Sequence, residues 1–225
     1  MKVTFISSTQ PSPELQAKGI KTAEDLVVYC ARVTSPSRQT DTESAPRLIR
    51  FLIKRKHWSP FEMADLCLEV ETSRAIAAQL LRHRSLSFQE FSQRYAPASL
   101  GFEKHEARGK VGESNRQGSA DNLSPEVKEW WRSMEDGMQW AAQALYDEAL
   151  AKGVAPEQAR FILPLGVTTR LYVKGSVRSW IHYLALRTDS HAQQEHREMA
   201  QAAKAIFDTH FPHIAQALAE GQGTA

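Results

Sequence analysis

The stretch ADLCLEVETSRAIAAQLLRHR, residues 64–84, joins two hydrophobic patterns and decides the class of the fold. Between residues 64 and 71, apolar and polar side chains alternate, which is typical of a half-buried strand. From Arg74 onward the apolar residues recur at helical spacing, and Ser73 stands where a helix N-cap is expected. The stretch therefore predicts a strand that leads directly into a helix over residues 74–84.

Outside this stretch, helical patterns outnumber strand patterns. We expect strands at residues 2–8 and 168–173, and helices at 22–33 (N-cap Thr22), 44–56, 124–153, 156–164, 176–187, 190–207 and after Pro212. Residues 103–123 are polar, contain glycine and have no hydrophobic period, which predicts a mobile surface loop. No linker divides the chain. We therefore predict one domain, residues 1–225, with a helix-rich α+β fold and a small mixed β-sheet.

Composition and charge exclude several classes of protein. The net charge of +2 is too small to indicate bulk binding of nucleic acid. No apolar run approaches the roughly 20 residues of a membrane span, and the first residues lack the apolar core of a signal peptide. Cys30 and Cys67 form no CxxC pair and lie in apolar patterns. We expect them to be packed rather than reactive, in the reducing cytosol.

Common catalytic motifs are also missing. The sequence contains neither GxGxxG nor GxxxxGK[ST], so it has neither usual phosphate-binding loop, and a non-Rossmann fold is expected. It has no GxSxG nucleophile motif. His191 and His196 are five residues apart, which directs them away from each other, so we predict no metal site and expect polar residues on the exposed side of that helix. Trp130, Trp131 and Trp140 have helical spacing and are predicted to be core residues.

The segment RHRSLSFQEFSQRY, residues 82–95, concentrates hydrogen-bonding groups. If the helix continues through residue 84, Gln79, Arg82 and His83 share one of its faces. If residues 88–95 are extended, Glu90, Ser92 and Arg94 point the same way. Arginines around one hollow suit an anionic ligand such as a nucleotide. A solvated basic helix end with salt bridges, such as Glu90 with Arg94, is the alternative, and spacing alone does not name a ligand.

These residues resemble a known enzyme family. Arg82-His83-Arg84, seven residues and then Ser92 match the RHR-x7-S signature of flavin-dependent thymidylate synthases, and the similarity extends through Glu90, Arg94 and Tyr95. Further similar blocks are His57 to Glu62, Ala159 to Leu165, Asn115 to Ser119 and Arg178 to Glu195. The resemblance covers nearly the whole chain in the right order. The chain departs from the usual pattern at Gln89, Met63, Ser176 and His182.

The resemblance implies reductive methylation of dUMP to dTMP, a methyltransferase reaction. Methylenetetrahydrofolate would be the carbon donor, and NADPH would be the reductant acting through FAD. Arg187 would be the catalytic residue, because it would stabilise negative charge on the pyrimidine. The implied dUMP-binding residues are Gln79, Arg82, Glu90, Phe91, Ser92, Gln93, Arg94, Arg160 and Arg187. The implied FAD-binding residues are Ser59, Glu62, Arg82, His83, Arg84, Glu90, Ser176, Val177, Arg178 and His182.

The resemblance further implies a cytoplasmic homotetramer with sites shared between subunits, without membrane or nucleic-acid partners. Two other functions remain open from the residues alone. One is an RNA- or nucleotide-binding protein without catalysis, whose affinity would fall steeply with salt. The other is a flavoprotein NADPH oxidase with a different acceptor.

Overall fold

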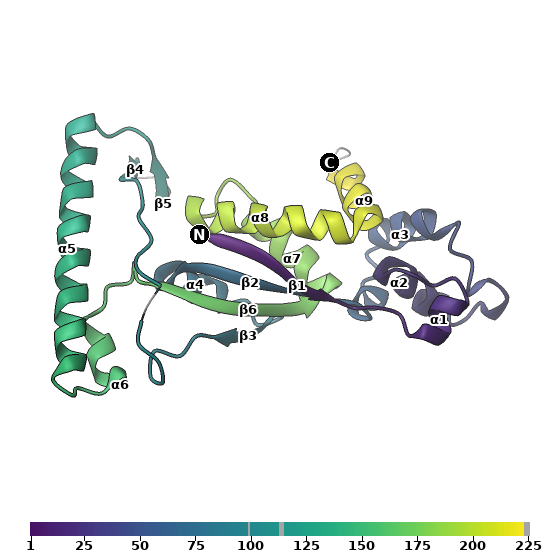
Figure 1. Cartoon of the computed structure of the whole chain (residues 1–225). Helices are drawn as coiled ribbons and strands as arrows, with labels where there is room; N and C mark the ends of the chain where they lie inside the picture. The colour runs from purple at the N-terminus through teal and green to yellow at the C-terminus, as the bar shows by residue number, and fades with distance from the viewer. Residues whose placement is uncertain (99, 113–114, 223–225) are drawn as a thin grey trace.

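The computed structural model describes residues 1–98, 100–112 and 115–222 of the chain (Figure 1). Its larger sheet contains β1 (Lys2–Ser8), β2 (Asp65–Ser73), β6 (Thr168–Ser176) and β3 (Ser87–Glu90), in the order β1-β2-β6-β3. Leu66, Leu68 and Val70 alternate along β2 and are buried, which is the pattern that the sequence predicts. The α+β class is confirmed. The described sheet is antiparallel at every pairing, however, so the prediction of a mixed sheet is wrong.

Helices cover this sheet and form the main hydrophobic core with it. They are α4 (Arg74–Leu80), α7 (Val177–Arg187) and α8 (Gln194–His210), while α9 (Pro212–Gln222) packs against α8. In Figure 1, α8 runs alongside β1, and α9 reaches towards α3 (Ala45–Lys54). Trp180 of α7 is buried in the core and donates its indole N–H to the Leu66 carbonyl at 2.9 Å. This hydrogen bond fixes α7 against β2, and α7 carries several of the predicted site residues.

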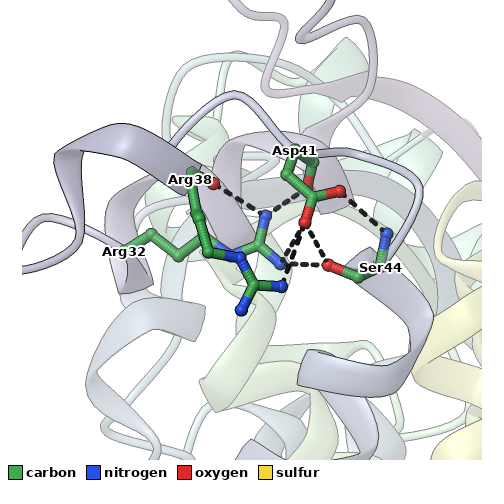
Figure 2. A network of polar contacts seen from close by, with 4 residues as sticks. All are labelled: Arg32, Arg38, Asp41 and Ser44. Atoms are coloured by element: carbon green, nitrogen blue, oxygen red, sulfur yellow. Dashed lines mark hydrogen bonds and ion pairs between the residues drawn. The ribbon is translucent and has the colours of Figure 1, made fainter.

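The N-terminal helices form one end of the molecule. They are α1 (Pro13–Ala17), α2 (Ala23–Ala31), η1 (Pro36–Arg38), α3 (Ala45–Lys54) and η2 (Ser59–Glu62). Thr22 caps α2 as predicted: its hydroxyl accepts from the Asp25 N–H, and Asp25 accepts from the Thr22 N–H. Figure 2 shows Arg32, at the end of α2, against Asp41 and Ser44. This contact ties α2 to the start of α3.

A second, smaller hydrophobic cluster lies under the long helix α5 (Pro125–Ala151), which stands at the opposite end of Figure 1. There α5 packs against α6 (Pro156–Ala159) and η3 (Arg160–Ile162). Its tryptophans were expected in the core, but Trp130 is 58%, Trp131 43% and Trp140 76% exposed, so that prediction is wrong. The reason is that α5 projects from the body and buries only a narrow strip, which includes Ala142 and Tyr146.

The polar segment before α5 is not wholly irregular. Its described residues contain the two-stranded antiparallel hairpin β4 (Gly109–Val111) and β5 (Asn115–Ala120). Short polar strands of this kind lack the apolar alternation by which sequence patterns reveal strands. Residues 113 and 114 of the predicted loop lie outside the described residues. Within the described part of the chain, no helix is both long and apolar enough to cross a membrane.

Candidate functional site

The segment that carries Arg82 and His83 is a turn rather than a helix. Helix α4 ends at Leu80, so the prediction of one helical face for Gln79, Arg82 and His83 is wrong. Backbone hydrogen bonds between residues three apart continue to Leu86, whose N–H donates to the His83 carbonyl at 3.0 Å. Leu86 is buried against Gly175, where a β-carbon would lie 2.4 Å from the leucine side chain. The chain turns here because β3 must reach β6.

The strand predicted for residues 88–95 is also shorter than expected. Strand β3 ends at Glu90, and residues 92–95 form a turn in which the Tyr95 N–H donates to the Ser92 carbonyl at 3.1 Å. Ser92 and Arg94 therefore do not continue the strand face of Glu90. Glu90 accepts a hydrogen bond from Thr169 at 2.9 Å and lies 3.4 Å from Arg74. The predicted Glu90–Arg94 salt bridge is absent among the described ion pairs.

Gln93, in this turn, keeps an unused donor. The side chain is 3% exposed, and its Nε2 atom has no hydrogen-bond partner. An unsatisfied buried amide costs about 1–3 kcal/mol, so a site of this kind favours a ligand that supplies an acceptor. Gln93 is one of the residues predicted to bind the nucleotide. Its unpaired N–H fits a phosphate or carbonyl oxygen.

Arg187, at the end of α7, donates from Nε to His83 Nε2 at 2.9 Å. Because His83 Nε2 accepts this hydrogen bond, the imidazole must be neutral and carry its proton on Nδ1. Burial, and then the positive charge of Arg187, hold the pKa of His83 below its usual range. No carboxylate of the described residues forms an ion pair with Arg187. The guanidinium charge therefore remains available to an anion.

A chain of hydrogen bonds lies beside this arginine, buried at His196 and exposed at Gln193, and the sequence patterns did not predict it. His196 of α8 is fully buried, and its ring contacts the Tyr183 hydroxyl at 3.1 Å and Gln79 Oε1 at 3.2 Å. Gln79 Nε2 donates to Gln193 Oε1 at 2.6 Å. Glu195, which is also buried, accepts from Gln193 at 2.9 Å and from Arg108 at 2.5 Å. These contacts bring α4, α7, α8 and the segment before β4 together around Gln79.

The prediction that this part of α8 places its polar residues on the exposed side is therefore wrong for Glu195 and His196. Helical spacing does carry a signal, because His196 is three residues before the buried Met199 and four before the buried Ala200. The partners of His196 come from other elements, which a linear pattern cannot show. No metal-binding cluster occurs among the described residues.

A second group of predicted residues surrounds the N-terminus of α7. Arg178 and Glu62 form an ion pair of 2.9 Å, which joins η2 to α7. Ser176 caps α7, and its hydroxyl accepts from the Ser179 N–H at 3.2 Å. The Val177 N–H donates to the Ala64 carbonyl at 2.8 Å. This group and Arg187 lie at opposite ends of α7, about 13 Å apart along the helix axis.

The other residues predicted to contact flavin are exposed or partly exposed. His182 stacks edge-on against Trp58 at 5.7 Å, and Ser59 lies at the surface at the start of η2. Arg82 and Arg84 are exposed, and neither forms an ion pair with a described carboxylate. Two guanidinium groups without a described carboxylate partner fit a cofactor that bears phosphate groups, such as FAD.

A third group lies near α6. Arg94 is 3.6 Å from Glu157, and Arg160 Nε donates to the Glu157 carbonyl at 3.2 Å. No hydrogen bond or ion pair of the described residues joins Arg94 or Arg160 to Arg187. One chain thus holds the predicted site residues in three separate groups. Their roles remain predictions.

The cysteines lie outside these three groups. Both are free and half-buried, and burial raises the pKa of each thiol. Neither is poised as a nucleophile. This agrees with the prediction that they are packed rather than reactive.

Comparison with known proteins matches this arrangement to one family. The family model described as thymidylate synthase complementing protein matches residues 17–213. The chain is 49% identical over 218 residues to the flavin-dependent thymidylate synthase of Synechocystis, covering 97% of this chain and 99% of the relative. The chain belongs to the flavin-dependent thymidylate synthase family. A probable flavin-dependent thymidylate synthase of Paramecium bursaria Chlorella virus 1 is 46% identical, with the same coverage of both chains.

A solved structure supports the family fold. The UMP/dUMP methylase PolB of Streptomyces cacaoi, bound with 5-Br dUMP, is 26% identical and superposes with a TM-score of 0.82, covering 97% of this chain and 94% of PolB. The same methylase bound with 5-Br UMP superposes with a TM-score of 0.81 at 25% identity, over 97% of this chain and 93% of that one. The resemblance that the RHR-x7-S signature indicates is confirmed. These comparisons do not favour a nucleic-acid-binding protein without catalysis.

Proposed function

We propose that this protein methylates dUMP reductively to dTMP, with methylenetetrahydrofolate as carbon donor and NADPH, acting through FAD, as reductant. Membership of the family supports the reaction. The observation that carries the proposal is the state of Arg187, a half-buried guanidinium held by a neutral histidine and without a described carboxylate partner. An arginine in this state is prepared to bind a ligand that develops negative charge.

Activation of the pyrimidine is the role proposed for Arg187. C5 of uracil is a poor nucleophile, and electron density reaches it when the ring carbonyls are polarised. A fixed positive charge at a carbonyl oxygen stabilises the charge that develops there, and it needs no reorganisation during the reaction. His83 holds the Arg187 side chain in place. Neither half-buried cysteine is required as a nucleophile.

Binding of the nucleotide is the role proposed for Gln79, Arg82, Glu90, Phe91, Ser92, Gln93, Arg94 and Arg160. The unpaired N–H of Gln93 supports this role, because an oxygen of dUMP would satisfy it. Ser92 is assigned to binding, since no described hydrogen bond joins its hydroxyl to a general base. Arg94 and Arg160 carry charge suited to a phosphate.

The flavin is proposed to lie against Ser59, Glu62, Arg82, His83, Arg84, Glu90, Ser176, Val177, Arg178 and His182. When bound, FAD would accept reducing equivalents from NADPH and deliver them to the one-carbon unit. The protein's part is to fix the cofactor against the nucleotide. The Glu62–Arg178 ion pair gives the N-terminus of α7 a defined shape for this purpose.

We further propose that the enzyme is a homotetramer that assembles sites from different subunits. Val127, Trp131, Met134, Met138 and Leu145 recur at helical spacing on α5, and each is at least 41% exposed. An apolar stripe of this length favours a protein partner over water, and a second copy supplies an identical stripe. The three separate groups of predicted site residues in one chain also support shared sites. The free cysteines fit a reducing compartment, for which we propose the cytoplasm.

The test is release of tritium from dUMP labelled at C5, in the presence of FAD, NADPH and methylenetetrahydrofolate. We expect release together with dTMP, dependent on both FAD and NADPH. Arg50→Ala is a matched control, because Arg50 is exposed and pairs with Glu220 away from α7. Oxidation of NADPH without tritium release would indicate a flavoprotein with another acceptor. Absence of both release and flavin binding would overturn the proposal.

A further inference from the structure

The hydrogen-bond chain around Gln79 has one direction only, and Glu195 sets it. Glu195 is the anchor because an ionised carboxylate can only accept hydrogen bonds. Burial raises its pKa, but the hydrogen bonds from Arg108, its own backbone and Gln193 outweigh this, and the pKa lies below its usual range. Gln193 must therefore turn its NH2 group towards Glu195, as the 2.9 Å contact has it.

The orientation of the Gln193 amide fixes the donor and the acceptor in each of the remaining hydrogen bonds. With its NH2 group on Glu195, Gln193 turns its carbonyl oxygen to Gln79, so Gln79 must donate. The carbonyl oxygen of Gln79 then faces His196 Nδ1, which must carry a proton. His196 Nε2 is left to accept from the Tyr183 hydroxyl at 3.1 Å. A reversed chain would place the Gln193 carbonyl against the Glu195 carboxylate, which is repulsive.

The surroundings keep His196 neutral. Its side chain is fully buried, and the charged or titratable groups nearest to it are His83, Arg187 and Tyr183. Burial, and then the positive charge of Arg187, lower the pKa of His196 to about 3. Burial raises the pKa of Tyr183, so its hydroxyl keeps its proton. The hydrogen bonds therefore keep the same donors and acceptors at any ordinary pH.

We propose that Glu195, Gln193 and His196 are positioning residues, which hold the Gln79 amide so that its free N–H faces the nucleotide. Gln79 Nε2 has two protons and uses one for Gln193, which leaves the other for an oxygen of the substrate. If the amide turned over, a carbonyl oxygen would face that acceptor, and binding would be lost. This inference rests on the proposed function, in which Gln79 binds dUMP.

Two variants of His196 separate positioning from packing. In His196→Asn the side-chain amide lies where Nδ1 was and still donates to Gln79. In His196→Gln the amide lies where Nε2 was, keeps the Tyr183 contact and leaves Gln79 without its donor. We expect the KM for dUMP to rise about tenfold in His196→Gln and to stay within about threefold in His196→Asn, with kcat changed little in both. His210→Asn, at the far end of α8 where the ring stacks on Phe5, is the control.

Glu195→Gln tests the anchor without changing its size. An amide at residue 195 can donate or accept, so the hydrogen bonds no longer fix the orientation of the Gln79 amide. We therefore expect the KM for dUMP to rise. A neutron crystal structure of the unsubstituted protein reads the tautomer directly, and we expect the deuteron on His196 Nδ1. Thermal unfolding of each variant shows whether the fold is intact.

A deuteron on Nε2 would overturn the inference, whatever the activity. Equal KM values for His196→Asn and His196→Gln in folded proteins would overturn it as well. Failure of the proposed function looks different, because the unsubstituted enzyme would then form no dTMP although the tautomer could still be as expected.

Discussion

Two arginines in this molecule occupy opposite situations. Arg32, 8% exposed, donates to the carbonyls of Arg38 and Asp41, to the Ser44 hydroxyl at 2.5 Å, and pairs with the Asp41 carboxylate (Figure 2). Among the residues that the structure describes, Arg187 has one hydrogen bond, to a neutral histidine, and no carboxylate partner. The hydrogen-bonding capacity of the Arg32 guanidinium is satisfied within the fold. Arg187 keeps its charge for a ligand.

The partners of the guanidinium distinguish structural from functional arginines. A buried guanidinium is costly unless carboxylates and carbonyls satisfy it, so the fold supplies them wherever the arginine serves the fold. An arginine that has no carboxylate partner in the fold can still bind an anionic ligand. Arg32 should therefore matter for stability, and Arg187 for turnover.

Replacing Arg187 with alanine should have the largest effect. We expect Arg187→Ala to fold normally and to lose about 10²- to 10³-fold in the rate of dTMP formation, as when a preorganised charge is removed from a developing anion. The assay is the dTMP yield at saturating dUMP, with the melting temperature measured alongside. Near-normal turnover would contradict the functional role of Arg187.

Replacing Arg32 should affect stability instead. We expect Arg32→Ala to lower the free energy of unfolding by about 3 kcal/mol, because Asp41, Ser44 and two carbonyls lose their donor. Arg38→Ala is the matched control: its side chain is 67% exposed and pairs with the same Asp41, so we expect less than about 1 kcal/mol. Urea unfolding measures both. Equal losses in the two variants would argue against the division.

Acid should reveal the neutral state of His196. The pKa of His196 is about 3 in the folded chain and about 6.5 when unfolded, so between these pH values only the unfolded chain takes up the proton. This group therefore lowers the stability as the pH falls from about 6.5 to 3. In His196→Asn, the dependence of unfolding free energy on pH should be smaller by one proton in that window. An unchanged slope would mean that His196 titrates normally.

Asp41 should show a smaller effect of acid, because its side chain is 30% exposed. Hydrogen bonds from the Ser44 hydroxyl and N–H, and more weakly from Arg38, lower the pKa of Asp41 to about 2, below its unfolded value of about 3.9. Deprotonated Asp41 thus stabilises the fold above about pH 4, and this contribution is lost as the pH falls towards 2. The stability difference between Asp41→Asn and the parent protein should shrink over that range. A constant difference would contradict the lowered pKa of Asp41.

Local patterns predicted much of this fold. The alternation in residues 64–71 and the N-cap at Thr22 are local signals, and the structure has a strand and a helix there. The end of α4 at Leu80 could not be predicted, because tertiary pairing of β3 with β6 turns the chain. The exposure of Trp140 depends on α5 leaving the body, which its helical spacing does not show. His196 and Glu195 were missed for the same reason, since Tyr183, Gln79 and Arg108 approach them from distant parts of the sequence.

The proposed role of Arg187 requires that its positive charge meets the nucleotide and not a carboxylate of the protein. A crystal structure of the protein with FAD and dUMP tests it most directly. We expect the Arg187 guanidinium to lie within hydrogen-bond distance of a pyrimidine oxygen, with His83 Nε2 still accepting from Arg187 Nε. Pairing of Arg187 with a carboxylate of a neighbouring subunit, away from the nucleotide, would contradict it.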